Sequence, residues 1–260
     1  DTAATTAAPA AAETTAAAAD TTAAPEKSEA ETEAEAKDDA ASGDLIVVGY
    51  AQVGAESDWR TANTESFKST FTEENGYKLI FDDAQQKQEN QIKAIRSFIQ
   101  QDVDYIVVAP VVETGWEAVL QEAQEAGIPV ILSDRQMDVD ESLYECWVGG
   151  NFIKEGETAG NWLADYLKAQ GRDGEDINIV TLQGTIGASA QVGRTEGFGN
   201  ILKQHDNWKM LDMQTGEFTQ AKGQEVMESF LKSYDDIDVV VAENDNMAFG
   251  AIDAIKAAGK

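Results

Sequence analysis

The sequence contains one cysteine, Cys146, and one histidine, His205. A single cysteine excludes an internal disulfide and a cysteine-built zinc site, and a single histidine removes most histidine-based metal sites and catalytic triads. We therefore expect neither a metal nor a cofactor. Because cysteine packs as a small apolar side chain, we predict that Cys146 is buried. His205 is predicted to lie at an exposed helix end.

Long apolar runs and an excess of positive charge are also missing. No stretch reaches the roughly 18 to 20 apolar residues of a membrane-spanning helix, and no charged-then-apolar signal peptide opens the chain, which we interpret as a processed, mature product. The 48 acidic residues outnumber the 19 basic ones and give a formal net charge of −29. Such a charge repels phosphate backbones and anionic lipids, so we expect no nucleic-acid partner.

The first 43 residues lack every aromatic and large aliphatic side chain. A segment of this composition buries too little apolar surface to offset its ordering entropy. We therefore predict a disordered Ala/Thr/Glu-rich tether over residues 1–43, which serves either as a leash at a membrane face or as an uninvolved tail. The remaining chain is divided into an N-terminal lobe, residues 44–150, and an incomplete C-terminal lobe, residues 151–260.

From Leu45 onward, short β-branched runs alternate with helical stretches, a pattern that predicts an α/β fold with parallel sheets. Strands are predicted near Leu45–Tyr50, Tyr77–Phe81, Tyr105–Ala109, Pro129–Leu132, Tyr144–Val148, Ile177–Leu182, Trp208–Gln214 and Asp238–Ala242. Helices are predicted near Trp59–Glu74, Lys87–Gln101, Trp116–Ala126, Ile153–Ala169, Ser189–Gln204, Gln220–Ser233 and Met247–Ala258. Glycines follow several of these helices, and Gly149-Gly150-Asn151 marks the expected boundary between the lobes.

Ligands of open parallel sheets bind at the carboxyl ends of the strands, so the residues after each strand are the candidates for a site. Trp59 and Arg60 follow the first strand, where Asp58 or Ser57 is interpreted as the helix cap. The segment 110–116 after the third strand is either a turn with a helix start or part of the site. Asp134-Arg135 after the fourth strand either forms an internal ion pair or binds vicinal hydroxyls.

The second half of the chain adds three such segments. The glycine-rich loop 183–189 leads into a helix with Arg194, but it lacks the Walker pattern and is a weak phosphate signal. Phe218 follows the seventh strand. Residues 243–246 after the eighth either ligate a cation or cap the last helix, and Asn244 offers both a donor and an acceptor to a hydroxyl. Aromatic rings, planar charged groups and amides without a nucleophile and base indicate a sugar-binding site.

The same segments resemble a known family. They are GYAQVGAESDWRTAN from Gly49, DDAQQKQENQIKAIRSFIQQDVDYIVVAPVVETGW from Asp82, IPVILSDR from Ile128, LQGTIGASAQVGRTEGF from Leu182, GEFTQAKGQEVMESF from Gly216 and AENDNMAFGAI from Ala242. From about Leu45 to the end the chain resembles the periplasmic sugar-binding proteins of ABC transporters, of the ribose and galactose type and closest to the galactofuranose-binding branch.

The resemblance implies a type I periplasmic-binding-protein fold, in which two Rossmann-like lobes close by a hinge around one small sugar. It further implies that Trp59 and Arg60 form one wall, that Asp134 and Arg135 bind hydroxyls, and that Arg194, Phe218 and Asn244 close from the second lobe. Glu56 lies in a loop distinctive of the galactofuranose-like group and is a further candidate. Family members usually continue past the position of Lys260, so a truncated second lobe without its return crossovers is expected.

The implied function is an extracytoplasmic substrate-binding protein that captures a monosaccharide and delivers it to ABC permease subunits. The protein is expected to be a monomer in the periplasm or at the cell surface, lipid-anchored through an N-terminal cysteine that this sequence does not contain. Three other functions compete with this interpretation of the sequence. A DNA-binding repressor is disfavoured by the acidic N-terminal segment. An enzyme using Asp82-Asp83 or Asp235-Asp236 is disfavoured because such pairs are usually solvated. A sugar-sensing receptor for chemotaxis or signalling stays open.

Overall fold

The computed structural model describes residues 45–260, in which eight strands alternate with seven helices and two 3-10 turns. The first half contains, in order, β1 (Ile46–Gln52), α1 (Asp58–Thr70), η1 (Glu73–Asn75), β2 (Tyr77–Asp83), α2 (Gln88–Gln100), β3 (Tyr105–Val108), α3 (Glu117–Glu125), β4 (Val130–Ser133), η2 (Glu141–Leu143) and β5 (Cys146–Val148). The second half contains α4 (Phe152–Ala169), β6 (Ile177–Gln183), α5 (Ser189–Leu202), β7 (Trp208–Thr215), α6 (Gln220–Ser233), β8 (Val239–Ala242) and α7 (Asp245–Ala257).

Every predicted strand and helix is present, with ends displaced by a few residues, and α6 has the predicted bounds. The glycines that end helical segments adopt the left-handed backbone that favours glycine, with φ of 83° at Gly76, 74° at Gly127, 71° at Gly171 and 71° at Gly259. The predicted tether, residues 1–43, lies outside the described residues.

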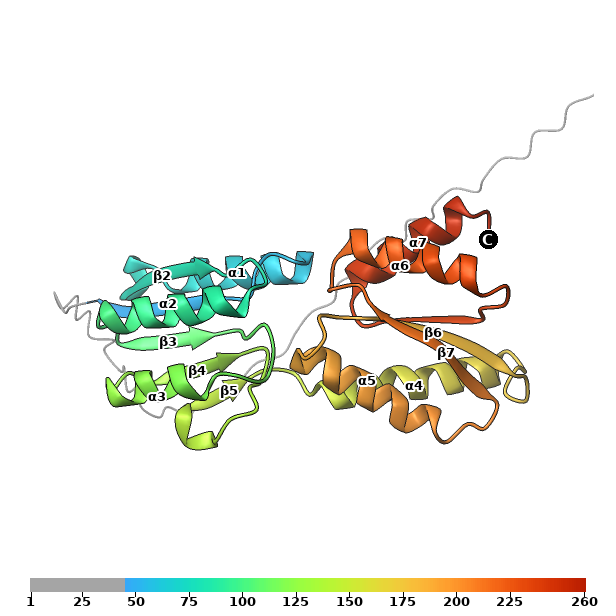
Figure 1. The fold of residues 1–260 in the computed structure, drawn as a ribbon, viewed down its shortest axis with the longest axis horizontal. Coiled ribbons are helices and arrows are strands. Elements are labelled where there is room, and N and C mark those ends of the chain that lie inside the picture. The colour runs from blue at the N-terminus through green and yellow to red at the C-terminus, as the bar shows by residue number, and fades with distance from the viewer. Residues whose placement is uncertain (1–44) are drawn as a thin grey trace, which may run out of the picture. The chain divides into compact units, whose positions relative to one another are not determined.

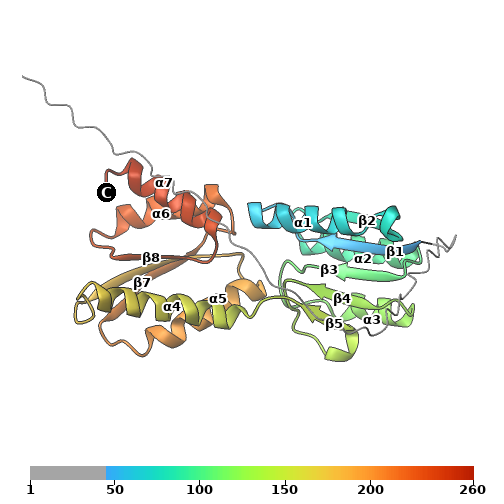
Figure 2. The same ribbon diagram turned by 180° about the vertical axis from the view of Figure 1, so that it is seen from behind.

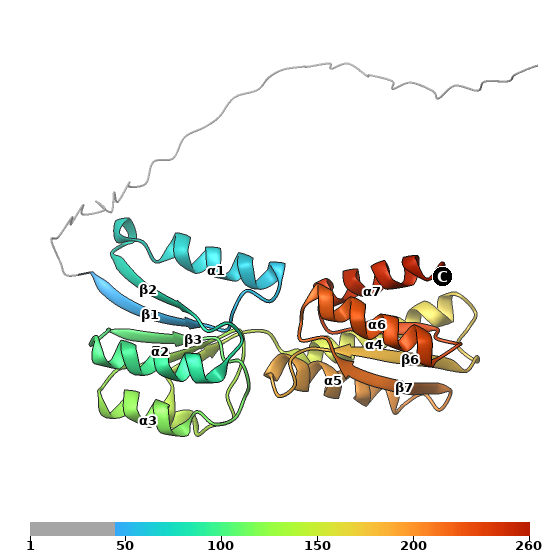
Figure 3. The same cartoon turned by 45° about the horizontal axis from the view of Figure 1, so that its top comes forward.

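The first five strands form one parallel sheet in the order β2-β1-β3-β4-β5. We call this sheet and its helices the first lobe. Alternate residues of β1 point to opposite faces, so Ala51 packs against α2 and α3, whereas Val48 and Tyr50 pack against Phe67 of α1. Figure 3 shows α1 on one face and α2 and α3 on the other. A parallel sheet covered on both faces is the α/β arrangement that the strand composition predicts.

The second lobe, α4 to α7, contains the parallel sheet β7-β6-β8. Ile177 and Ile179 of β6 pack with Leu163 of α4 and Phe198 of α5, whereas residues of the opposite face pack against α6 and α7. Figures 1 and 2, seen from opposite sides, show the two helix pairs on either side of this sheet. Within residues 45–260, the chain passes from one sheet to the other once, between β5 and α4. The lobe boundary at residue 150 stays a prediction.

Cys146 is exposed, so the prediction that it is buried is wrong. It begins β5, the edge strand of the first sheet, and exposed residues alternate with a half-buried one along that strand. An edge strand lacks a neighbour on one side and packs less completely than a central one. His205 follows α5 as predicted, but it is half-buried because its ring stacks on Trp208 at a centroid distance of 4.1 Å.

Candidate functional site

The start of α1 places two neighbouring side chains in opposite environments. Ser57 is the N-cap, because its backbone is extended and its Oγ accepts a hydrogen bond from the main-chain N of Arg60 at 3.2 Å. The cap is therefore Ser57 rather than Asp58. In the first turn, the side chain of Trp59 is 57% exposed, whereas that of Arg60 is 2% exposed.

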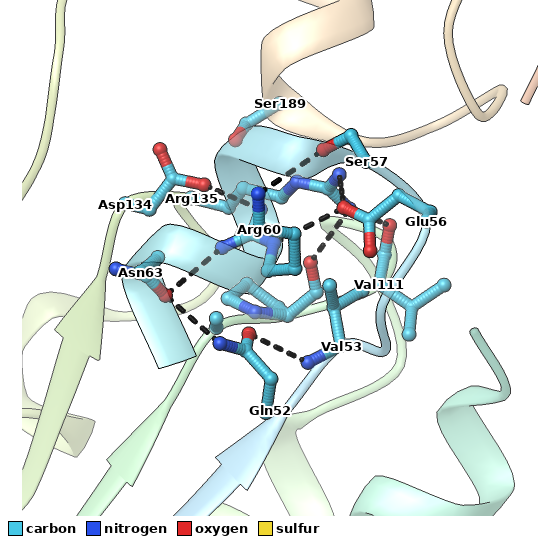
Figure 4. A network of polar contacts seen from close by, with 12 residues as sticks. Gln52, Val53, Glu56, Ser57, Arg60, Asn63, Val111, Asp134, Arg135 and Ser189 are labelled. Carbon is cyan, nitrogen blue, oxygen red and sulfur yellow. Dashed lines mark hydrogen bonds and ion pairs between the residues drawn. The ribbon is translucent and has the colours of Figure 1, made fainter. Parts of the chain in front are cut away.

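Arg60 lies between two carboxylates. Its Nη2 donates to Oδ2 of Asp134 at 2.7 Å, and its Nε donates to Oε1 of Glu56 at 3.1 Å (Figure 4). Burial alone would lower the pKa of Arg60, but the charges of Glu56 and Asp134 outweigh it and the pKa is raised. The guanidinium also lies 4.9 Å from the ring centroid of Trp59. Arg60 is therefore a fully paired cation that joins the ends of β1 and β4.

Arg135 is 3% exposed and is bound mainly to the first lobe. Its Nη2 donates to Oε1 of Glu56 at 3.3 Å, and its Nη1 donates to the main-chain O of Val111 at 3.3 Å and of Pro110 at 3.4 Å. Burial and the neighbouring positive charge of Arg60 lower the pKa of Arg135 to about 10, so it remains charged at neutral pH. Two buried atoms of this network, Oε2 of Glu56 and Nε of Arg135, have no hydrogen-bond partner among residues 45–260.

Asp134 and Arg135 therefore do not form the internal ion pair that was one of the two predictions for them, since each pairs with a residue of the β1–α1 segment instead. Asp134 has a left-handed backbone with φ of 64°, which a short polar residue tolerates. Its main-chain N donates to the main-chain O of Val148 at 2.7 Å, and its main-chain O accepts from Nε1 of Trp147 at 3.1 Å. Strand β5 thus fixes the turn that carries both charges.

Phe218 approaches the same network from the second lobe. Its side chain is 3% exposed, and its ring centroid lies 5.1 Å from the guanidinium carbon of Arg135. Phe218 and its neighbour Glu217 both have positive φ, 62° and 54°, which is an outlier for a bulky residue and marks backbone strain. On its other side the ring rests against Gly184, where an added Cβ would lie 1.9 Å from Cζ of Phe218.

Asn244 supports both a helix and this strained turn. Its Oδ1 accepts from the main-chain N of Met247 at 3.0 Å and caps α7, and its Nδ2 donates to the main-chain O of Phe218 at 2.9 Å. Of the two open predictions for residues 243–246, helix capping is confirmed. The side chain that was expected to offer a donor and an acceptor to a ligand is therefore largely engaged within the protein, with one amide hydrogen left to donate.

Arg194 of α5 has partners of its own. Its Nε donates to Oε2 of Glu155 at 2.9 Å, and its Nη1 donates to the main-chain O of Glu243 at 2.6 Å. The guanidinium lies 5.1 Å from the ring centroid of Phe152. Helix α4 contributes both Phe152 and Glu155 from its first turn.

All eight predicted site residues line one cavity of about 530 Å³ with walls from both lobes. They are Glu56, Trp59, Arg60, Asp134, Arg135, Arg194, Phe218 and Asn244. Four hydrogen bonds connect the lobes. In one of them the main-chain N of Glu113 donates to the main-chain O of Gly187 at 2.8 Å. Asp58 and Asn246 exchange two, with the Asp58 N donating to Oδ1 of Asn246 at 3.2 Å, and the Gln136 N donates to Oγ of Ser189 at 2.9 Å.

A cavity at the strand ends of two parallel α/β lobes matches a known arrangement. A family model described as the periplasmic binding protein domain matches residues 46–260. The chain belongs to this family.

Three relatives indicate the branch of the periplasmic binding proteins. The galactofuranose-binding protein YtfQ of Escherichia coli is 50% identical over 82% of this chain and 67% of that protein. A Mycobacterium smegmatis structure in complex with β-D-fucofuranose is 53% identical, with a TM-score of 0.79 over 83% of this chain and 70% of that one. The binding protein of the arabinose ABC transporter from Shewanella sp. ANA-3, bound to L-arabinofuranose, is 50% identical with a TM-score of 0.76, over 82% of this chain and 69% of that one.

These relatives are binding proteins rather than enzymes, and the family is one that works outside the cytoplasmic membrane. The chain spans between 57% and 67% of the length of the first curated relatives it matches. In the part of the chain that the structure describes, no helix is long and apolar enough to cross a membrane. Over the same residues, no group of acidic, cysteine and histidine side chains is arranged to hold a metal ion.

The site contains residues that the sequence analysis missed. Phe152 and Glu155 follow the lobe boundary rather than a strand, so the rule of strand ends does not find them. Phe249, 53% exposed, lines the cavity from the second turn of α7, and its place shortly after the strand-end segment 243–246 was the available signal. Trp116 is not part of the cavity. It is fully buried in the first lobe and donates to the main-chain O of Val112, so segment 110–116 is a turn and helix start at that point.

Proposed function

We propose that the protein captures an uncharged monosaccharide in its furanose ring form within this cavity. The observation that carries the proposal is that each guanidinium of the cavity is already paired. Arg60 binds Glu56 and Asp134, and Arg135 shares Glu56. Arg194 binds Glu155. Because these cations are balanced, the cavity offers orientation and hydrogen bonding without a free positive charge that would favour an anionic ligand.

Aromatic faces supply the second requirement of a sugar site. Trp59, Phe152 and Phe249 line the cavity from three different helices, and Phe218 lines it from the loop after β7. The C–H faces of a sugar ring pack on such rings, while its hydroxyl groups take bidentate hydrogen bonds from planar charged groups. We assign ligand contact to the eight residues predicted from the sequence, with Trp59 as the exposed stacking surface, Phe218 as a ring edge in the wall beside Arg135, and Asp134 and Arg135 as hydroxyl partners.

The furanose ring form and the transport role are supported by the relatives. The Mycobacterium smegmatis and Shewanella structures contain fucofuranose and arabinofuranose, and the latter belongs to an ABC transporter. We propose that this protein likewise delivers its sugar to the permease of an ABC importer, acting as a monomer outside the cytoplasmic membrane and held there by a lipid anchor. A hinge at residues 149–151 would let the two lobes, 44–150 and 151–260, open and close.

The ring form is tested with sugars that can form only one ring. A pyranose closes through the hydroxyl on carbon 5 and a furanose through that on carbon 4, so 5-deoxygalactose is confined to the furanose and 4-deoxygalactose to the pyranose. Isothermal titration calorimetry of the full-length protein should show binding of 5-deoxygalactose, of arabinose and of galactose, and none of 4-deoxygalactose. Galacturonate, the anionic counterpart, should not bind.

Preference for 4-deoxygalactose over 5-deoxygalactose would contradict the furanose proposal and leave a sugar-binding role. Tighter binding of galacturonate than of galactose would contradict the neutral-ligand argument. Delivery is measured separately, as stimulation of ATP hydrolysis by the candidate permease in lipid vesicles when the sugar-loaded protein is added.

A further inference from the structure

A buried carboxylate, Glu243, forms part of the second-lobe wall of the cavity. It directly follows β8 and is 6% exposed. Its Oε2 accepts from the main-chain N of Gly184 at 2.7 Å, and its Oε1 accepts from Oγ1 of Thr195 at 2.6 Å. One side chain therefore joins the end of β8, the loop after β6 and helix α5.

The segments that Glu243 joins are those that position the ligand-facing groups. Gly184 is the surface on which the ring of Phe218 rests, and the main-chain O of Glu243 accepts from Nη1 of Arg194. The next residue, Asn244, holds the strained backbone of Phe218. A shift of the Glu243 side chain would therefore displace the groups that support the ring of Phe218 and the guanidinium of Arg194.

We propose that Glu243 is a positioning residue, which holds Phe218 and Arg194 in their binding geometry and must be ionised to do so. The inference rests on the proposed sugar-binding function and adds a control of affinity to it. Thr195 Oγ1 accepts from Nε2 of Gln183 at 2.9 Å and from Nε2 of Gln191 at 3.0 Å, so its own hydrogen is directed to Glu243. Both carboxyl oxygens of Glu243 face donors, and a proton on either oxygen would displace one of them.

Burial, opposed by nearby hydrogen-bond donors and one positive charge, sets the pH at which Glu243 takes up this proton. Burial raises the pKa of Glu243 to about 7, against the opposing effect of its hydrogen bonds from Thr195 and Gly184 and of the Arg194 charge. Arg194 is the charged side chain that faces it from α5, and Glu155 of α4 pairs with Arg194 in turn. Binding should therefore weaken when the solution is acidified through neutral pH.

The test compares Glu243→Gln with the wild-type full-length protein. The amide of Gln has the same shape, but its NH2 group must face one of the two donors, as a protonated carboxyl would. If only the ionised form binds, wild-type affinity for galactose should fall by about tenfold between pH 8 and pH 6, since about a tenth of the molecules remain ionised. Glu243→Gln should bind weakly at both pH values and show no pH dependence.

Two control variants separate positioning from other effects. Glu196→Gln removes an exposed carboxylate next to Thr195 and should bind as the wild type does. His205→Gln removes the only histidine, the residue type most often responsible for charge changes near neutral pH, and should keep the wild-type pH dependence. Thr195→Val should lower affinity as Glu243→Gln does, and Thr195→Ser, which keeps the hydroxyl, should restore it.

A readout without sugar keeps this inference separate from the proposed function. The backbone amide resonances of Gly184 and Phe218 should shift with a midpoint near pH 7 in the wild type and stay fixed in Glu243→Gln. Wild-type affinity in Glu243→Gln, or resonances that do not respond to pH, would overturn the positioning role. Absence of binding to every sugar, with the amide titration intact, would instead reject the proposed function.

Discussion

Trp59 and Arg60 are adjacent in the chain, yet they contribute to the site in different ways. Successive residues of a helix point about 100° apart, so the first turn of α1 directs Trp59 outward and Arg60 into a buried ion network. Arg60 therefore holds the two strand ends together. The side chain of Trp59 stacks on the Arg60 guanidinium, so a substitution of Trp59 removes that contact and no ion pair.

Replacement of Trp59 by Ala should weaken sugar binding by roughly 1–3 kcal/mol, because an aromatic stacking surface is lost. The free energy of unfolding should change little, since the ring is 57% exposed. Arg135→Ala should weaken binding to a similar or larger extent through unpaired hydroxyls, and should also destabilise the fold. Trp162→Ala, at a 64% exposed tryptophan of α4, is the matched control. Wild-type affinity in both site variants would refute the assignment, as measured by calorimetry.

Residue types predicted which side chains meet, but not how they pair. The positions of Asp134 and Arg135 at a strand end placed them in the predicted site, and both residues line the cavity. Their partners, Arg60 and Glu56, come from another strand end, and residue type gives no preference among several charges at one sheet edge. The prediction that Cys146 is buried was wrong for a related reason. Burial of a strand residue depends on whether its strand lies at the edge of the sheet, and the order of strands in a sheet is a tertiary property.

At the scale of elements, the loops after β6 and β7 act as a pair. Gly184 has no Cβ, and the ring of Phe218 occupies the space where one would lie. The main-chain O of Gly184 accepts from Oγ1 of Thr215 at 2.7 Å, at the end of β7. The main-chain N of Gly184, in the loop with the weak phosphate signal, donates to the Glu243 carboxylate, which excludes an anion at that amide.

Gly184→Ala should reduce sugar affinity by at least about tenfold, because the new methyl group displaces the ring of Phe218. Gly199→Ala in the neighbouring helix α5 is the matched control, since its Cβ would meet no atom within 4 Å. That variant should keep full affinity and gain up to about 1 kcal/mol of stability from the better helix former. Equal affinity of the two variants, measured by calorimetry, would show that the Phe218 ring does not contribute.

The order and type of the elements followed from hydrophobic periodicity and from the glycines that end helices, because both are local properties of the chain. The contributions of α4 and α7 to the cavity could not be predicted from these local properties. Phe152 and Phe249 reach it only because the tertiary fold of the second lobe brings the first two turns of these helices to the cavity. Such contacts between segments distant in sequence have no signature in any one window of residues.

The whole molecule carries a net charge of −29, so negative charges repel one another in the folded state. Whether a buried carboxyl is ionised therefore affects the free energy of unfolding. Hydrogen bonds and ion pairs with arginine lower the pKa of two carboxyls, Glu122 beside Arg96 and Asp238 beside Arg172. Their stabilising contribution is present above the unfolded-state pKa and is lost only in acid. Burial has the opposite effect on Asp82, Glu113 and Glu243 and raises the pKa of each, that of Glu243 to about 7.

The stability of the wild type should therefore carry a component that falls as pH rises from about 4.5 to about 7. In that range the unfolded chain has released the proton of Glu243 while the folded protein still holds it, so rising pH favours unfolding, by a total on the order of 3 kcal/mol. Chemical denaturation at several pH values should show this component in the wild type and not in Glu243→Gln. A constant difference between the two proteins across that range would contradict it.

Asn244 joins the cap of α7 and the backbone of Phe218 through a single side chain. We therefore expect natural variation at this position to be restricted, since a substitution that adjusts the ligand preference also removes the cap of a helix. Trp59 and Phe249 have no comparable duty, because both are more than half exposed at the cavity. Divergence of sugar preference among homologous proteins should accordingly concentrate at these two positions, where a new side chain leaves the folding of either lobe unchanged.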